Sequence, residues 1–438
     1  MKKSFRAFGL DSATVILATC AAGLSFASTA NAADFGGDCC ADLEERIAEL
    51  EATTARKGNR KVNLTISGHV HQAVMFWDDG VEDNVYVVDN QNDQSNFAFT
   101  GDAKINPDWT AGFNLIVRLQ QALSGEVSAD DDDAALDDGP LIVREANWFL
   151  ESKTFGKLSV GFAPRVTDGA PESDLSEAGL PAYAGMQDIG GGFSLRRSSD
   201  GSALDISWGD LMSHLNGDTA NLVRYDTPEL AGFVFSVSAG EDDIWDVGGT
   251  FSGKLGQIAI EAAVAYSQLT DNADDEPDSN VIVGSVAFLH EPTGLNFLVA
   301  AGQQSFEAAV LDTDGVTREA EDFKFIYMKA GWITQLNTLG NTAFYGEYGH
   351  FEDLATARTD SALVEGLTGG ANNRVAGSEV EAFGFGVNQN IEAADMDIYI
   401  GYRYYDAEFS VVDGVGAAVA TADTEDFQSV IVGSDIRF

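Results

Sequence analysis

The sequence predicts an all-β fold, a transmembrane barrel of 16 antiparallel strands. Three observations predict it. From residue 61 onward, apolar and polar residues alternate with the period of two that places side chains on opposite faces of a strand. The connections between these segments alternate between short turns and long acidic links. Beyond the N-terminal stretch, no window offers the 18 consecutive apolar residues that predict a transmembrane helix.

The composition excludes several classes of protein. The 438 residues include 70 Asp and Glu against 25 Lys and Arg, which gives a formal net charge of −45. That balance argues against a nucleic-acid binder, because phosphate contacts need clustered basic residues. A hydrophobic content of 45% argues against a disordered acidic chain. The 46 Gly and 27 Phe favour strands joined by turns.

Residues 1–32 have the pattern of a secretory signal peptide. Basic residues precede a short apolar stretch at 15–26, and the small-residue sequence Ala-Asn-Ala ends at residue 32. We therefore expect cleavage before Ala33. A transmembrane anchor fits less well, because the run is short and interrupted by Ser and Thr. A lipoprotein site at Cys20 would follow Thr19, which is a poor fit.

Residues 33–60 are predicted to form a periplasmic segment with a short helix at 42–57. Leu43, Ile47 and Leu50 recur at helical spacing, and the acidic start suits the helix dipole. The adjacent Cys39 and Cys40 allow a strained ring or a cross-link between subunits, and the sequence does not decide between them. With no histidine or further cysteine nearby, we expect no zinc site there.

Residues 61–438 are predicted to form the barrel. In the first segment the apolar residues of one face are Val62, Leu64, Ile66, Val70, Val74 and Phe76. The polar residues of the other face are Lys61, Asn63, Thr65, Ser67, His69 and His71. Sixteen such segments lie at 61–77, 95–106, 109–120, 142–151, 155–163, 221–228, 233–240, 244–253, 256–267, 280–290, 295–303, 323–334, 341–350, 378–389, 396–409 and 426–438.

The connections indicate a membrane. Short links such as 106–108 and 152–154 alternate with long ones, of which 121–141 holds seven acids and no base. A soluble β-sandwich has no reason to gather its long loops at one end. An outer-membrane barrel has short periplasmic turns, long outer loops and strands that alternate between a lipid-facing and a lumen-facing side. Closure also leaves no strand edge unpaired in lipid.

The last strand and several ring side chains suit the same fold. In the final segment, apolar residues alternate with polar ones up to the terminal Phe438, and an aromatic end suits the headgroup region. We expect Phe438 to help the chain insert into the membrane. Trp109, Trp332, Tyr402 and Tyr404 lie near predicted strand ends, as aromatic girdles do.

Three segments carry a resemblance to a known family. Residues 42–70 resemble the mature start of general outer-membrane porins of alphaproteobacteria, of the rhizobial and brucella type. Residues 221–240 and 342–349, with the final Phe438, are also porin-like. The resemblance implies a homotrimer in the outer membrane that lets small hydrophilic solutes and ions diffuse passively. It implies no enzyme activity and no cofactor, and a third outer loop folded into the barrel to narrow it.

The position of that loop suggests the candidate site residues. The loop that follows the fifth strand, 164–192, carries the carboxylates Asp168, Glu172, Asp174, Glu177 and Asp188. Strand alternation and the resemblance place these basic residues on the lumen wall: Arg118, Arg144, Arg224, Lys329 and Arg403. Acids on the loop and bases on the wall would set up a transverse field. Lys104 and Arg437 are weaker candidates, near the periplasmic ends.

Some of these assignments have simpler alternatives. Each charge can be an ordinary solvated group. Arg144 is ambiguous, because counting back from Ala146 and Trp148 as lipid-facing residues places it outside, whereas the resemblance places it inside. From the loop carboxylates and the acidic outer loops we expect a mild preference for cations.

Other chemistries fit the sequence poorly. His69 and His71 share a strand face, but no third metal ligand is evident, so we predict no metal site. The run 130–133 of four Asp lacks the glycine turn and the closing Glu of a calcium loop. We expect it to be a solvated outer loop that contacts lipopolysaccharide through divalent ions.

Three rival functions remain at this stage. If 191–199 and 203–209 were two more barrel strands, the result would be an 18-stranded, sugar-specific channel. An outer-membrane enzyme would need Ser/His or Asp/His groups at one rim, and no motif surrounds the five histidines. A structural barrel with a plugged lumen would not conduct.

Overall fold

The computed structural model describes residues 62–134, 139–241, 243–270, 278–306, 309–311, 317–319, 321–357, 361–369, 373–413 and 416–438. The chain divides into two compact units, Met1–Arg60 and Lys61–Phe438, and the described residues all belong to the second. The predicted signal peptide, the helix at 42–57, and Cys39 and Cys40 lie outside the described residues. Within the described ranges, every helix is too short or too polar to span a lipid bilayer.

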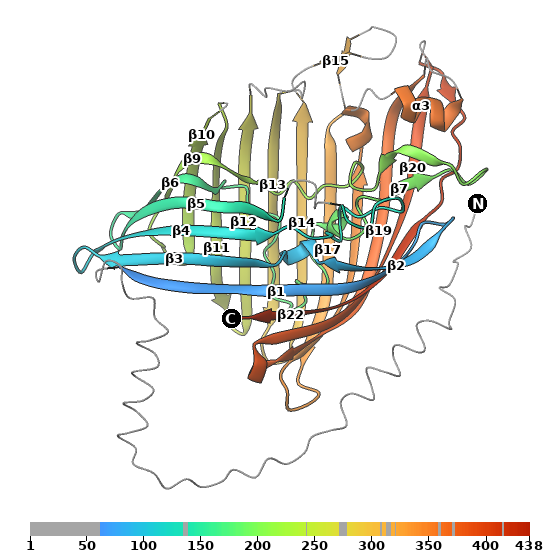
Figure 1. Ribbon diagram of the computed structural model, residues 1–438. Helices are drawn as coiled ribbons and strands as arrows, with labels where there is room; N and C mark the ends of the chain where they lie inside the picture. The colour runs from blue at the N-terminus through green and yellow to red at the C-terminus, as the bar shows by residue number, and fades with distance from the viewer. Residues whose placement is uncertain are drawn as a thin grey trace. The chain divides into compact units, whose positions relative to one another are not determined.

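Sixteen antiparallel strands close into one barrel (Figure 1). In order around the barrel they are β1 (Asn63–Asp78), β3 (Asn96–Lys104), β4 (Trp109–Leu119), β5 (Leu141–Ser152), β6 (Gly156–Pro164), β9 (Thr219–Asp226), β10 (Phe233–Gly240), β11 (Trp245–Leu255), β12 (Ile258–Leu269), β13 (Ser279–His290), β14 (Leu295–Phe306), β17 (Phe323–Thr334), β18 (Thr342–Glu352), β19 (Arg374–Ile391), β20 (Met396–Val412) and β22 (Phe427–Arg437). Strand β22 pairs with β1 from His69 to Asp78, which closes the barrel.

The two faces of the strands differ as the sequence predicts. On β1, Leu64, Ile66 and Val70 are about half exposed on the outer surface, whereas His69 and His71 are buried on the inner side. Apolar side chains facing lipid and polar ones facing the lumen are the pattern of an outer-membrane barrel. Phe438 joins the ladder, because its backbone exchanges hydrogen bonds of 3.1 and 2.9 Å with Gly68.

All sixteen predicted strands are present, and the main difference lies in the first outer connection. There β2 (Asp83–Asp89) pairs with the outer half of β1, and β3 pairs with the other half. Between them the 3-10 turn η1 (Gln91–Asp93) interrupts the wall, and Asn90 caps it by accepting a hydrogen bond from the Asn92 backbone N–H. The sequence shows no alternation break strong enough to predict this turn.

Several short elements are not among the sixteen strands of the barrel wall. Strands β7 (Ser194–Arg196) and β8 (Ala203–Ser207) form a separate two-stranded sheet, so the 18-stranded alternative is wrong. Strands β15 (Ala309–Leu311) and β16 (Thr317–Glu319) form another hairpin. Strand β21 (Ala418–Val419) pairs antiparallel with the end of β20. The helical elements are η3 (Met186–Asp188), η4 (Leu354–Ala357), α3 (Ser361–Thr368) and η5 (Glu392–Ala394).

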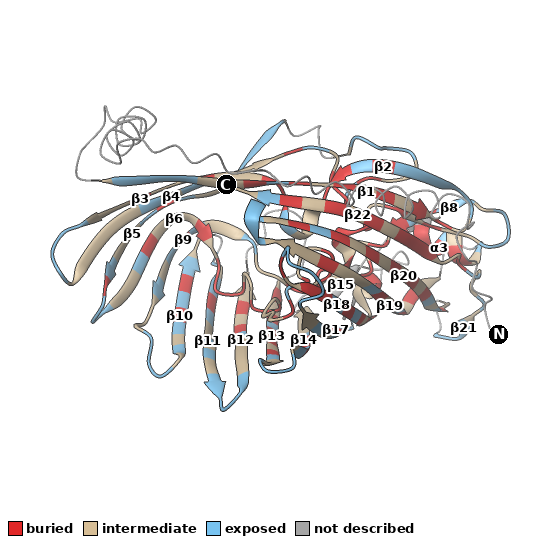
Figure 2. Cartoon of the chain, turned by 90° about the horizontal axis from the view of Figure 1, so that it is seen from below, coloured by how far each residue is buried: buried red, intermediate tan, exposed pale blue. Residues whose placement is uncertain are grey.

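The apolar core of the barrel lies inside it and on one side. Figure 2 shows buried residues gathered beside β1, β20 and β22, and fewer of them along β9 to β11. The centre of this core is an aromatic cluster, in which the ring centroids of Trp77 and Phe193 are 4.6 Å apart and those of Phe193 and Phe427 are 5.0 Å apart. Aromatic pairs at such distances add about 0.5–1.5 kcal/mol beyond their area burial.

Candidate functional site: a loop inside the barrel

The connection between β6 and β9, residues 165–218, folds into the barrel. The predicted inner loop is therefore present, but it runs well past residue 192. It begins with Arg165, whose guanidinium is bidentate to Asp246 of β11, with Nη2–Oδ1 and Nε–Oδ2 distances of 2.7 and 3.0 Å. It returns through Asn216, whose amide donates to Asp168 at 3.2 Å. The start of the loop is thus fixed to the wall by a buried ion pair, and its end is tied back to its start by a partly buried hydrogen bond.

We call residues 165–189 the tethered segment, because basic residues of the wall hold it. Arg144 makes the first of these contacts, with 2.6 Å between its Nη2 and Asp168 Oδ2. A β-bulge explains its orientation: Ile116 pairs with Glu145 and Val117 with Val143, so Arg144 is the extra residue. The bulge turns Arg144 inward, and simple counting along the strand, which placed it outside, was wrong.

Lys329 and Arg403 make the next two contacts. Lys329 Nζ lies 2.7 Å from Asp174 Oδ2 and donates to the Ala182 carbonyl, also at 2.7 Å. Arg403 pairs with Glu347 of the wall at 2.9 Å and donates to the Met186 carbonyl at 2.9 Å. Both basic side chains are almost fully buried. A buried charge needs such partners, because an unpaired one is strongly unfavourable.

The remaining two predicted wall bases differ from each other. Arg224 pairs with Asp226 on its own strand and donates to the carbonyls of Pro164 and Arg165, where the loop begins. Arg118 has no ion pair or hydrogen bond among the described residues. Arg144, Asp218, Asp168 and Asp93 are its charged neighbours. Within the part of the chain that the structure describes, Arg118 therefore has no direct carboxylate partner.

The other loop carboxylates lack basic wall partners. Glu172 faces His214 at 3.2 Å, and Glu177 accepts a hydrogen bond from Asn341 at 3.0 Å. Asp188 is buried and accepts a hydrogen bond from the Tyr183 hydroxyl. Burial raises the pKa of the Asp188 carboxyl from 3.8 to about 7. Asp188 is therefore part of the loop's interior packing, in contrast to the exposed Glu177.

Several contacts of the loop were not predicted from the sequence. The Tyr399 hydroxyl lies 2.7 Å from Nε2 of His71, and Asn90 donates both to the Tyr399 oxygen and to the Leu180 carbonyl, at 2.6 and 3.1 Å. Asn92 also donates to Leu180, at 2.8 Å. His71 thus has a structural role, and its shared face with His69 is confirmed. The dense Asn and Asp residues of 89–94 were the available signal.

We call residues 190–212 the apolar hairpin, because it is rich in buried apolar side chains. It contains β7 and β8, and its buried side chains are Phe193, Leu195, Leu204, Ile206, Trp208, Leu211 and Met212. Helix α3 contacts β8. Polar contacts add to the packing: Arg196 lies 2.7 Å from Asp79 in the turn between β1 and β2, and Arg197 donates to the Gly366 carbonyl. The hairpin thereby occupies part of the lumen beside β1, β20 and β22.

A cavity of about 640 Å³ lies beside the tethered segment. It is lined by the loop, by η1 and by residues near the short-turn ends of the strands, including Asn341, Asn388 and Arg437. Five carboxylates line it, against the single basic residue Arg437: Asp93, Glu172, Asp174, Glu177 and Asp397. The electrostatic balance at this point of the lumen is therefore acidic.

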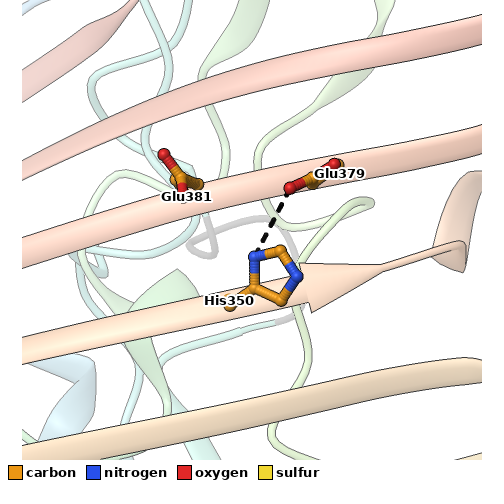
Figure 3. Close-up of side chains that lie close together, drawn as sticks. All are labelled: His350, Glu379 and Glu381. Atoms are coloured by element: carbon orange, nitrogen blue, oxygen red, sulfur yellow. Dashed lines mark ion pairs between the residues drawn. The ribbon is translucent and has the colours of Figure 1, made fainter.

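One cluster of potential metal ligands lies on the outer face of the barrel. His350 of β18 and Glu379 and Glu381 of β19 offer ligand atoms within 4.8 Å of one another (Figure 3). His350 Nδ1 is 3.7 Å from Glu379 and its Nε2 is 3.0 Å from Glu352. These residues alternate with the inward-facing Glu347 and Phe351 and lie away from the lumen.

A closed barrel of sixteen strands, apolar outside and narrowed inside by its own loop, defines an outer-membrane porin. A family model described as Gram-negative porin matches residues 13–410. The chain belongs to this Gram-negative porin family. It is an outer-membrane β-barrel protein that forms a channel for passive diffusion.

Solved structures share the fold at low sequence identity. OmpT of Vibrio cholerae, an outer membrane protein folded in vitro and described in its trimer form, has a TM-score of 0.52 and 13% identity, covering 86% of this chain and 99% of that chain. The anion-selective porin of Comamonas acidovorans has a TM-score of 0.50 and 14% identity, covering 86% of this chain and 100% of that chain. Comparison with curated proteins gives no match in sequence.

Proposed function

We propose that this porin is a general diffusion channel of the alphaproteobacterial type that works as a homotrimer and mildly prefers cations. The resemblance of residues 42–70 to the start of alphaproteobacterial porins supports the alphaproteobacterial type. The trimer form of the Vibrio OmpT structure, which has the same fold, supports the assembly. The neighbour from Comamonas is named anion-selective, so the fold alone does not set the sign of the selectivity.

The unequal pairing of charges on the loop and the wall carries this proposal. Arg144, Lys329 and Arg403 are engaged in holding the loop, and Arg224 pairs with Asp226. These bases contribute little free positive charge to the passage. By contrast, Asp93, Glu172 and Glu177 have no Lys or Arg partner within the described residues. Carboxylates whose charge is not cancelled by a Lys or Arg attract cations and repel anions in a narrow pore.

The mechanism needs no catalytic group. The tethered segment limits the size of the solute, and Glu172 and Glu177 with Arg118 set up the field that orders dipolar solutes across the passage. Asp168, Asp174 and Asp188 hold the segment in place through Arg144, Lys329 and the Tyr183 hydroxyl. A fixed loop filters by size because it cannot move aside for a larger solute.

The remaining parts of the proposal concern export and the membrane. Residues 1–32 direct export and are removed, and 33–60 remain in the periplasm. The acids of the outer loops, including 130–133, contact lipopolysaccharide through divalent ions. The outward-facing group of His350, Glu379 and Glu381 suits the same role. It lies beside Tyr348, whose hydroxyl donates to Glu381 at 3.1 Å, and outward-facing tyrosines are typical of the headgroup level.

Reversal potentials in planar bilayers across a KCl gradient test the proposed function. We expect stepwise increases of the current as channels insert, and a reversal potential whose sign shows that K⁺ passes more readily than Cl⁻. The variant Glu172→Gln/Glu177→Gln should open to a similar conductance with a smaller preference. A matched control, Glu151→Gln, changes an exposed carboxylate near the end of β5, outside the cavity, and should leave the potential unchanged. Absence of conducting steps would favour the plugged structural barrel instead.

A further inference from the structure

The acidic cavity beside the tethered segment has more specific chemistry than a general passage needs. Two of its five carboxylates are neutralised: Asp174 by Lys329, and Asp397 by Arg437. Asp93, Glu172 and Glu177 keep no Lys or Arg partner within the described residues. The cavity therefore offers three carboxylates to whatever enters it.

Two residues that line the same cavity, Asn388 and Asn92, also carry buried amide oxygens without a hydrogen bond in the described structure. Asn388 is only 4% exposed, and its Nδ2 donates to the Glu177 carbonyl at 2.8 Å and to Asp397 at 3.0 Å. These two bonds fix the orientation of the amide and leave its buried Oδ1 without a hydrogen bond in the described structure. Asn92 donates to Leu180 in the same manner and leaves its own buried Oδ1 unpaired. A buried acceptor without a donor is unfavourable, so each of these oxygens favours a ligand that can donate a hydrogen bond to it.

The backbone at Glu177 is a third unusual feature. Its φ is 54°, in the left-handed region that residues other than Gly, Asn and Asp seldom adopt. The adjoining contacts hold this conformation, because the Glu177 carbonyl accepts from Asn388 and its carboxylate from Asn341. Such conformations cluster at ligand-binding positions, where the surrounding structure maintains them.

We propose that this cavity binds small organic cations rich in N–H donors, of the guanidinium or primary-amine class, as they cross the channel. This inference rests on the proposed function, since the ligand reaches the cavity through the pore. A guanidinium has five N–H donors and no acceptor, which matches a lining of carboxylates with unsatisfied amide acceptors buried beside it. The volume of about 640 Å³ lies within the usual range for small-molecule sites.

Binding at such a site slows a solute on its way through the pore. The cavity lies near the short-turn ends of the strands, which face the periplasm in barrels of this kind, so a bound cation would dwell there after it has passed the loop. A dwelling solute interrupts the ion current. The ligand class can therefore be tested on the open channel itself.

Single-channel recordings with two cations of equal charge test the proposal. Guanidinium and tetramethylammonium each carry one positive charge, but only guanidinium has N–H donors. We expect guanidinium, and more strongly the divalent agmatine, to interrupt the current at concentrations where tetramethylammonium does not. Equal effects of guanidinium and tetramethylammonium would overturn the proposal, because charge alone would then account for the interaction.

Variants locate the effect. Glu177→Gln should weaken agmatine binding about tenfold, as expected for the loss of one charge-assisted hydrogen bond. The control Glu151→Gln should not weaken it. Calorimetric titration of the detergent-solubilised protein with agmatine measures the same affinity without conduction. Channels that conduct but do not respond to agmatine overturn this inference alone, whereas a protein that forms no channels overturns the proposed function.

Discussion

The two halves of the inner loop are held inside the barrel in different ways. The tethered segment is fixed by ion pairs and carbonyl contacts from the wall, through Arg144, Lys329 and Arg403. The apolar hairpin is fixed by rings and aliphatic side chains, with Trp208 and Phe193 fully buried. The contrast indicates a division of roles. The polar half can line a water-filled passage, because its charges need water or partners, whereas the apolar half excludes water and closes part of the lumen.

The largest effect is expected when one buried tether is broken. Replacing Arg403 by Leu leaves Glu347, which is 5% exposed, without its cation. Truncating one partner of a buried pair costs about 3–5 kcal/mol. Thermal unfolding in detergent should show this loss. The loss comes from the buried Glu347 carboxylate that is left without a partner, so Arg403→Leu/Glu347→Gln should recover much of the stability. A double variant as unstable as Arg403→Leu would contradict this explanation.

The apolar hairpin should respond to a cavity instead. Trp208 is 1% exposed, and its ring centroid lies 5.6 Å from that of Tyr405. Trp208→Ala should destabilise the protein by about 3 kcal/mol, near the lower end for buried aromatic truncations. The cation preference should stay as it is, since no carboxylate of the passage changes. A changed reversal potential in this variant would show that the two halves are not independent.

Asp188, buried at the end of the tethered segment, should make stability depend on pH. Its folded pKa of about 7 lies above the ordinary 3.8, so the folded chain retains a proton that the unfolded chain releases. Stability therefore falls as the pH rises from about 4 to 7. Asp188→Asn removes this dependence. The difference in the free energy of unfolding between the variant and the wild type should therefore shift in favour of the variant by roughly 2–3 kcal/mol from pH 5 to pH 8. A constant difference in melting temperature between the two proteins across this range would refute the assignment.

The smallest expected effect on stability, with a clear effect on selectivity, belongs to Arg118. It has no direct carboxylate partner among the described residues. Arg118→Gln should therefore change the free energy of unfolding by less than about 1 kcal/mol. The cation preference measured by reversal potential should increase, because a free positive charge leaves the passage. An unchanged potential would remove Arg118 from the charges that filter ions.

The wall of the barrel could be predicted from the sequence more completely than its interior. Alternation of period two determines which residues face lipid, so the sixteen strands and the inward side of Lys329 and Arg403 followed directly. The bulge at Arg144 shifts that alternation by one residue, and only the pairing with β4 reveals it. The buried hairpin at 194–207 resembled ordinary strands, because a short apolar run does not indicate which surface it packs against.

The pairing of charges could not be predicted from the sequence either, because the partners lie far apart along the chain. Asp174 and Lys329 are 155 positions apart, and nothing local indicates their contact. The loop acids and the wall bases were predicted as opposite sides of a field, but three of the bases hold the loop in place. Among the described residues, two of the acids without a Lys or Arg partner, Glu172 and Glu177, were predicted. Asp93 was missed because the turn at η1 is not apparent from the alternation.

The single-channel conductance of a chain without two of its tethers tests the central claim, that wall bases hold the inner loop at the width that limits the pore. In Arg144→Met/Lys329→Met, Asp168 and Asp174 lose their cations while Arg403 is kept. The control Lys254→Met removes an exposed ion pair between Lys254, near the end of β11, and Glu291, in the turn after β13. The account predicts a larger and noisier conductance for the double variant and an unchanged one for the control. A double variant with the conductance of the wild type would contradict it.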